Sequence, residues 1–216
     1  MADKPGYWDE ATRSLARVDP VLRRLVRAYP GLHLTRRSDA FTALARAICG
    51  QQISVRAAEA VWRRFVAAVA PREASAPFPA IAPADVAAFE PAALRTCGLS
   101  GRKALYVHDL ARHFAAGRLD PRGWRDLSDE ALIAALCQVK GIGRWTAEMF
   151  LIFHELRPDV LPEDDIGLQR AVAVHYHRGR RVALSTLRRR GETWRPWRSV
   201  ATWYLWRSLD PVPVEY

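Results

Sequence analysis

The sequence has few cysteines and no hydrophobic run of membrane length, and both shortages exclude whole classes of protein. Only 3 of its 216 residues are cysteine. Cys49, Cys97 and Cys137 lie far apart and cannot supply the four thiolates of a zinc knuckle or an iron–sulfur cluster. Such an odd, scattered set is typical of a reducing compartment. The opening residues also lack the apolar core of a signal peptide, so we expect a cytoplasmic protein with no membrane contact.

Metal-ligand spacing and strand patterns are missing as well. His175 and His177 are separated by one residue, but no third ligand lies close by in the sequence, so no metal site is predicted. No stretch of alternating β-branched residues is long enough to predict a strand. Apolar residues instead recur every three or four positions in the segments 15–29, 41–48, 55–69, 107–114 and 132–139. The predicted fold class is therefore all-α. Five prolines between Pro71 and Pro91 predict a loop with at most a short helix near Asp85–Phe89.

Positive charge is abundant, and nearly all of it is arginine. There are 33 basic residues against 23 acidic ones, a net charge of +10, and only Lys4, Lys103 and Lys140 are lysines. The planar donor fork of arginine suits phosphate better than a point charge does. A basic protein of this kind fits a polyanionic partner such as nucleic acid. A general compositional bias toward arginine and alanine explains the excess equally well.

Residues 128–153, SDEALIAALCQVKGIGRWTAEMFLIF, form the most specific pattern. Ser128 can cap a helix that must stop at the two glycines of Gly141-Ile142-Gly143, and a second helix then begins at Arg144. The amides after such a turn point outward at a helix N-terminus, where they can hold a phosphate. An ordinary helical hairpin whose glycines only turn the chain is the alternative.

The string VKGIGRWTA resembles the helix-hairpin-helix of DNA repair glycosylases. Together with LPEDDIGLQR at 161–170 and WRPWRSVATWYLW at 194–206, the resemblance covers most of residues 40–208. It is closest to the bacterial DNA-3-methyladenine glycosylase II family. The resemblance implies one domain over 1–216 made of two packed helical subdomains, 40–150 with the hairpin and 1–39 plus 151–216, with the active-site cleft between them.

The resemblance assigns the catalytic role to Asp165, the carboxylate about twenty residues beyond the hairpin, just before a helix. A fixed negative charge stabilises the positive charge that builds on a sugar when an N-glycosidic bond breaks. As a plain helix cap, Asp165 would contribute about 1 kcal/mol and no chemistry. Glu163 and Asp164 are the neighbours that could cap the helix instead.

Three residues match positions that line the base pocket in that family: Trp145, Met149 and Trp206. Electron-rich aromatic faces attract cationic, alkylated bases. We expect Trp62, Trp194 and Trp203 to pack in the core instead. Glycosylases that also cleave the backbone carry a lysine where this chain has Trp145, so the resemblance implies a monofunctional enzyme that leaves an abasic site.

The turn that follows Ile48 is the expected wedge, which fills the gap left by a flipped base in related glycosylases. Gln52 and Ile53 are the candidates, and a plain polar turn between two helices is the alternative. A helix start capped by Ser100 is a further expected contact. The predicted DNA-binding residues are Gln51, Gln52, Ile53, Ser54, Ser100, Lys103, Lys140, Gly141, Ile142, Gly143, Arg144 and Thr146.

The expected partner is double-stranded DNA with damaged bases, bound by a monomer associated with the nucleoid. The resemblance implies no required cofactor, although hairpins of this type sometimes hold a monovalent cation through backbone carbonyls. Two other functions stay open: a glycosylase for deaminated or oxidised bases, and a non-catalytic helix-hairpin-helix DNA-binding protein.

Overall fold

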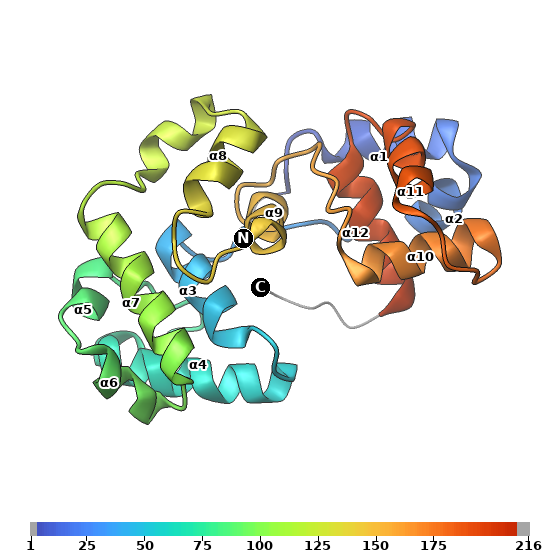
Figure 1. The fold of residues 1–216 in the computed structure, drawn as a ribbon. Helices are drawn as coiled ribbons and strands as arrows, with labels where there is room; N and C mark the ends of the chain where they lie inside the picture. The colour runs from blue at the N-terminus through green and yellow to red at the C-terminus, as the bar shows by residue number, and fades with distance from the viewer. Residues whose placement is uncertain (1–3, 211–216) are drawn as a thin grey trace. The chain divides into compact units, whose positions relative to one another are not determined.

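A computed structural model describes residues 4–210, and within that range the chain forms helices and connecting segments with no β-strand (Figure 1). The predicted all-α class is confirmed. The chain divides into two compact units. The central unit is Arg37–Phe150, and the terminal unit comprises, among the described residues, 4–36 and 151–210. The division falls inside α9 (Arg144–Phe153).

The remaining helices are distributed between the two units. The terminal unit contains α1 (Trp8–Val18), α2 (Pro20–Ala28), α10 (Ile166–His177), α11 (Leu184–Glu192) and α12 (Arg198–Leu209). The central unit contains α3 (Ala40–Gly50), α4 (Val55–Val69), α5 (Pro83–Ala87), α6 (Pro91–Leu94), α7 (Gly101–Ala115) and α8 (Asp129–Leu136). Its short 3-10 helices are Pro71–Glu73, Arg95–Cys97 and Pro121–Asp126.

Side-chain caps begin several helices, two of them at the serines that the sequence predicted. Asp19 accepts hydrogen bonds from the first amides of α2, and the Ser100 and Ser128 hydroxyls accept from Lys103 N and Ala131 N in α7 and α8. Asp39 caps α3 by accepting from Thr42 N at 2.9 Å. Each such cap stabilises its helix by about 1 kcal/mol.

The proline-rich stretch contains more helix than predicted. A short helix was expected near Asp85–Phe89, whereas α5 covers Pro83–Ala87 and a further short helix, α6, begins at Pro91. Proline at the first helical position has a backbone angle already suited to the helix and lacks an amide that would have no partner there. Pro83 and Pro91 therefore start helices, although the pattern of prolines was taken to interrupt them.

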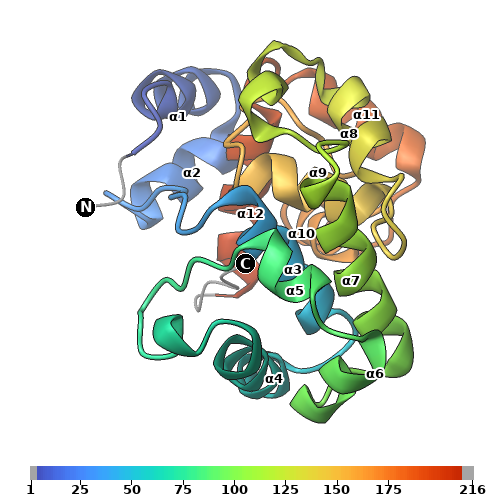
Figure 2. The same cartoon turned by 90° about the vertical axis from the view of Figure 1, so that its left-hand side faces the viewer.

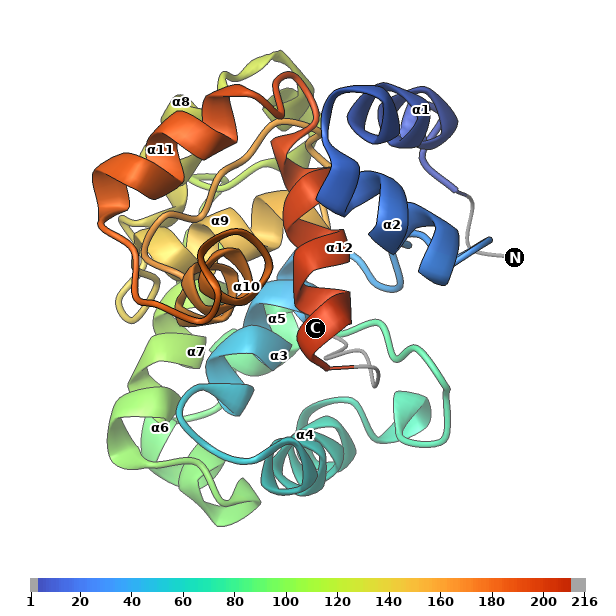
Figure 3. The same ribbon diagram turned by 90° about the vertical axis from the view of Figure 1, so that its right-hand side faces the viewer.

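A buried carboxylate organises the core of the terminal unit, where α12 packs against both α2 and α10 (Figure 3). Asp19 is 3% exposed, and its Oδ1 accepts from Val21 N and Leu22 N. Its Oδ2 accepts from Tyr176 Oη at 2.8 Å and from Trp194 Nε1 at 3.1 Å. A buried charge is tolerated when it is fully hydrogen-bonded. Asp19 thus joins the start of α2 to α10 and to the segment before α12.

Aromatic side chains fill the core of the central unit, in which α7 packs against α3 and α5 (Figure 2). Phe41 meets Phe114 edge to face with ring centroids 5.4 Å apart, Phe114 meets Trp124 at 6.1 Å, and Trp124 meets Phe150 at 5.5 Å. These T-shaped pairs add to the stabilisation from buried area. They tie α3, α7, the 3-10 helix Pro121–Asp126 and Phe150 of α9 into one core.

The tryptophans expected in the core and the three cysteines differ in how deeply they are buried. Trp62, Trp194 and Trp203 are buried, as predicted. Cys49 and Cys97 are buried free thiols, whereas Cys137 is half-buried. Burial raises the pKa of the Cys49 thiol to about 12, so it stays protonated and unreactive.

None of the helices in residues 4–210 is both long enough and apolar enough to cross a lipid bilayer. Within the same residues, no three or more histidine, cysteine, aspartate or glutamate side chains gather in a way that could hold a metal ion.

Candidate functional site

Asp165 lies directly before α10 and is 9% exposed. Its Oδ1 accepts a hydrogen bond from Leu168 N at 2.6 Å and another from Trp206 Nε1 at 2.7 Å. Asp165 is therefore the cap of α10. Of the two neighbours that could have taken that role, Asp164 is exposed and Glu163 pairs with Arg188. The two donors hold the carboxylate in one orientation at a helix N-terminus.

Trp206 links this carboxylate to an aromatic stack in the terminal unit. Its ring lies nearly parallel to that of Phe153, with centroids 5.6 Å apart and an interplanar angle of 11°. Gly167 lies against both groups, because a Cβ there would stand 3.0 Å from Asp165 Oδ1 and 3.2 Å from the Trp206 indole. A side chain at position 167 would therefore crowd the pair. The importance of Gly167 was not predicted, although the run Asp165-Ile166-Gly167 is visible in the sequence.

The glycine turn of the hairpin begins earlier than predicted. Helix α8 was expected to continue up to Gly141, but it ends at Leu136. Residues 137–142 then form tight turns, with Gln138 N bonded to Ala135 O and Ile142 N to Val139 O. Helix α9 starts at Arg144, as predicted. The amides of these turns bond to the last carbonyls of α8, those of Ile133, Ala135 and Leu136.

Helix α7 supports the hairpin turn through two residues that the sequence analysis missed. Asp109 Oδ2 accepts from Lys140 N at 2.9 Å. The Tyr106 ring lies against Gly141, where a Cβ would come within 2.1 Å of it. Gly141 also has φ +84°, a conformation that favours glycine. Both its backbone angle and its contact with Tyr106 therefore require glycine.

The two basic residues beside the turn differ in their surroundings. The Arg144 guanidinium is paired with Glu130 and, at 2.9 Å, with Glu148. The hydrogen bond that it donates to Glu130 raises the pKa of Arg144. Lys140 is exposed and forms no ion pair within residues 4–210. Arg144 thus joins α8 to α9, while the charge of Lys140 is available at the surface.

The hairpin residues and the first turns of α9 divide by exposure. Trp145 is 37% exposed, and Gly143 is exposed with open space where a Cβ would stand. Ile142, Thr146 and Met149 are buried. Ile142, predicted to bind DNA, is therefore buried, and the exposed surface of the turn is provided by Gly143 and Trp145.

The turn between α3 and α4 is fixed by contacts within the central unit. Gln51 Nε2 donates to Gly141 O at 3.0 Å, so the amide of Gln51 holds this turn against the hairpin. Lys103 Nζ donates to Cys49 O at 2.9 Å, at the C-terminal end of α3, and burial lowers the pKa of Lys103. Gln52 has φ +57°, Ile53 is 40% exposed, and Ser54 caps α4. Gln52 and Ile53 form the exposed tip of a braced turn.

Replacing Gln51 by alanine is expected to loosen the hairpin. Because a neutral hydrogen bond contributes about 1 kcal/mol, we expect roughly fivefold faster amide hydrogen exchange at residues 139–143, measured by mass spectrometry. Gln138→Ala is the matched control, since Gln138 donates only within its own turn, to Ala134 O. Equal exchange in the Gln51 variant and the wild type would mean that this bond does not hold the turn.

The structure thus brings the predicted residues together in two groups. In the terminal unit, Asp165 and Trp206 are in direct contact. In the central unit, Gln51 joins the exposed turn to the hairpin. Both groups present polar atoms that are fixed by neighbours far away in the sequence.

Comparisons with known proteins show the family to which the chain belongs. The family described as HhH-GPD superfamily base excision DNA repair protein matches residues 45–196. DNA-3-methyladenine glycosylase 1 of Schizosaccharomyces pombe is 32% identical over 189 residues, which are 87% of this chain and 80% of that protein. DNA-3-methyladenine glycosylase 2 of Escherichia coli (strain K12) is 34% identical over 203 residues, 92% of this chain and 68% of that protein.

A solved structure supports the same relationship. The Schizosaccharomyces pombe 3-methyladenine DNA glycosylase in complex with abasic DNA matches with a TM-score of 0.79 and 29% identity, over 96% of this chain and 98% of that one.

Proposed function

Because this chain belongs to the HhH-GPD superfamily of base excision DNA repair proteins, we propose that it is a monofunctional DNA glycosylase for alkylated bases. Its substrates are duplexes that carry bases of the 3-methyladenine and 7-methylguanine type. The observation that carries the proposal is the Asp165 carboxylate, held by Leu168 N and Trp206 Nε1 at a helix N-terminus. The 3-methyladenine glycosylases that resemble the chain over most of its length support the choice of substrate.

The proposed reaction breaks the bond between the base and C1′ of the deoxyribose. The bonding electron pair leaves with the base, and the sugar acquires positive charge that the fixed negative charge of Asp165 stabilises. Water then adds its oxygen to C1′ and loses a proton, which leaves an abasic site. A base methylated on a ring nitrogen is cationic and departs as a neutral molecule, so little acid catalysis is needed.

We assign recognition of the cationic base to aromatic and soft side chains. Trp206 offers its indole beside Asp165. Trp145 and Met149 are assigned to base contacts from the family resemblance. Attraction between a cation and an aromatic ring contributes about 0.5–2 kcal/mol and favours charged bases over undamaged ones.

DNA binding is assigned to the hairpin and to the turn between α3 and α4. Lys140 and the exposed amides around Gly143 suit a phosphate. Gln52 or Ile53 is the proposed wedge. Among the other predicted DNA-binding residues, Gln51, Lys103 and Arg144 act by holding these elements, because their polar groups are bonded to Gly141 O, Cys49 O and two glutamates.

The remaining features of the proposal follow the family resemblance. The enzyme needs no cofactor, acts as a monomer and works in the cytoplasm at the nucleoid. A monovalent cation bound by hairpin carbonyls would add positive charge beside the phosphate.

Measuring base release tests the function directly. Duplexes with 3-methyladenine or 7-methylguanine are expected to lose the base, while duplexes with hypoxanthine or 8-oxoguanine react at least about tenfold more slowly, because neutral bases lack the attraction of a cation to the aromatic rings. Faster release of the neutral lesions would assign the enzyme to deaminated or oxidised bases. DNA binding with no release of any base would identify a non-catalytic binding protein.

Borohydride trapping tests the monofunctional assignment. Trp145 stands where a lysine would form a Schiff base, so we expect no covalent enzyme–DNA adduct after reduction and strand cleavage only after alkali. A trapped adduct on the same substrate would contradict this assignment and leave base release itself unaffected.

A further inference from the structure

An open groove between α1 and α2 of the terminal unit is lined mainly by arginines. Its lining residues are Thr12, Arg13, Ala16, Arg17, Arg23, Val26 and Arg27. All four guanidinium side chains are exposed, while the smaller residues between them are only partly so. No acidic residue belongs to this lining. The groove is therefore a strongly positive surface, and none of its lining residues belongs to the Asp165 site or to the hairpin.

The spacing of the arginines makes this surface costly for the protein when no ligand is bound. Arg13 and Arg17 are four residues apart on α1, and Arg23 and Arg27 are four apart on α2. Like charges at this spacing are neighbours on a helix and destabilise it. Within residues 4–210, none of the four forms an ion pair. A bound anion would relieve this repulsion.

Several other arginines of the chain have a carboxylate or an aromatic ring as a partner. Arg144, Arg195 and Arg198 each bond to carboxylates. In the basic run near α11, Arg188 pairs with Glu163, and Arg190 lies over the Tyr176 ring at 4.4 Å. The groove is thus distinguished by four exposed arginines that line one concave surface with no acidic residue in its lining.

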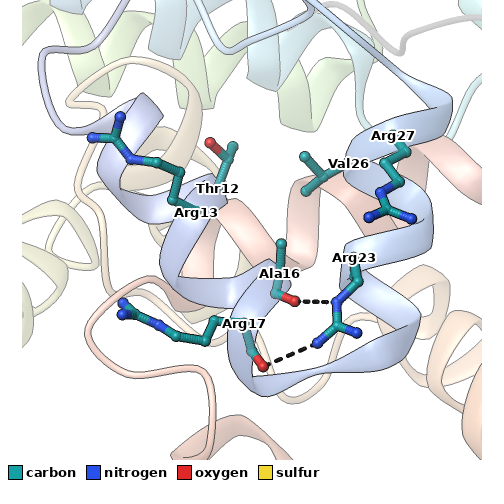
Figure 4. Close-up of a pocket in the computed structure, with 7 residues that line it drawn as sticks. All are labelled: Thr12, Arg13, Ala16, Arg17, Arg23, Val26 and Arg27. Atoms are coloured by element: carbon teal, nitrogen blue, oxygen red, sulfur yellow. Dashed lines mark hydrogen bonds between the residues drawn. The ribbon is translucent and has the colours of Figure 1, made fainter.

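The side chains of the groove are arranged along a face (Figure 4). Arg23 reaches from α2 to the end of α1, where its Nε donates to Ala16 O at 2.6 Å and its Nη2 to Arg17 O at 3.2 Å. Arg13 and Arg17 point away from α2, and Arg27 lies over α2. The positive groups are spread out, which suits a row of negative charges better than one small anion.

We propose that the α1–α2 groove binds the phosphate backbone of DNA and adds sequence-independent contacts away from the damaged nucleotide. Arginine forks match phosphate oxygens, and neutralising successive phosphates releases counterions from the duplex. The choice of DNA as the polyanion rests on the proposed function. An acidic protein segment is the competing ligand, and it lacks the regular phosphate spacing along an extended backbone.

The test compares two double variants that remove the same charge. Arg17→Gln with Arg27→Gln changes the groove, whereas Arg24→Gln with Arg118→Gln changes exposed arginines outside it. Arg23 is kept because it binds backbone carbonyls. Affinity for an undamaged duplex is measured by fluorescence anisotropy over a series of salt concentrations, after circular dichroism has verified folding.

The groove variant is expected to bind DNA about tenfold more weakly. Its plot of log K against log salt should be less steep by about two, one for each lost phosphate contact. The control should stay within about twofold of the wild type, with an unchanged slope. Equal losses in both variants would overturn the proposal, because they would reflect net charge alone.

Competition with polyglutamate separates the two ligand classes. Unchanged DNA affinity in the groove variant, together with weaker binding of polyglutamate, would overturn the proposal and assign the groove to an acidic protein segment. Base release by the wild-type protein is measured separately on a methylated duplex. The absence of base release would contradict the proposed glycosylase function. The comparison of DNA affinity between the groove variant and the control variant would still be valid.

Discussion

Asp165→Asn is expected to slow base release by about a thousandfold, because it removes the charge that stabilises the sugar cation while keeping the shape of the side chain. Asparagine is as good a helix cap as aspartate. In the wild-type protein, Leu168 N and Trp206 Nε1 both donate to Asp165 Oδ1. The amide oxygen of asparagine can accept the same two hydrogen bonds. Single-turnover release of 3-methyladenine measures the loss, and affinity for an undamaged duplex should stay within about twofold.

Asp164→Asn provides the matched control for this experiment. Asp164 is the neighbouring carboxylate and is exposed, whereas Asp165 is buried. Its substitution removes the same charge from the same segment and should leave the rate of release close to that of the wild type. Wild-type activity in the Asp165 variant would reduce Asp165 to a helix cap. A large fall in melting temperature would instead point to lost stability as the cause of any inactivity.

Local rules explain which parts of the structure could be predicted from the sequence. The all-α class and the helix starts at Ser100 and Ser128 depend on residues within one or two turns of each other. The end of α8 was predicted less well because both glycines of the hairpin were taken to stop the helix, whereas the turns begin at Cys137. Periodicity finds helices reliably, but the details of a helix C-terminus depend on how each carbonyl is satisfied.

Contacts over long separations were beyond the sequence analysis. Gln51 and Gly141 are 90 residues apart, and Lys103 and Cys49 are 54 apart. Gln51 and Lys103 were predicted to bind DNA from the family resemblance, and Arg144 from its positive charge beside the glycine turn. In the structure, the polar groups of all three form hydrogen bonds or ion pairs with other parts of the protein. Residue type alone cannot distinguish a surface donor from one that a distant carbonyl or carboxylate has already engaged.

Trp206 illustrates the same point and leads to the second large effect. The resemblance placed it in the base pocket, whereas its bond to Asp165, 41 residues away, indicates that it also orients the carboxylate. Two substitutions separate these roles. Trp206→Phe keeps a ring that can stack on Phe153 but removes the indole N–H, and Trp206→Ala removes both.

A hydrogen bond to a charged group contributes about 1.5–3 kcal/mol, so the phenylalanine variant should release 3-methyladenine about ten- to a hundredfold more slowly at saturating enzyme. Loss of the ring should reduce the rate of the alanine variant about a further tenfold, because the cationic base then loses an aromatic contact. Affinity for undamaged DNA should change by no more than about twofold in either variant, since neither contact involves a phosphate. Trp203→Phe, a change to a buried core tryptophan of the same helix, tests whether any rate loss arises from a disturbed α12. A phenylalanine variant as fast as the wild type would show that Leu168 N alone is enough to orient Asp165, and the role of Trp206 would then be limited to its ring.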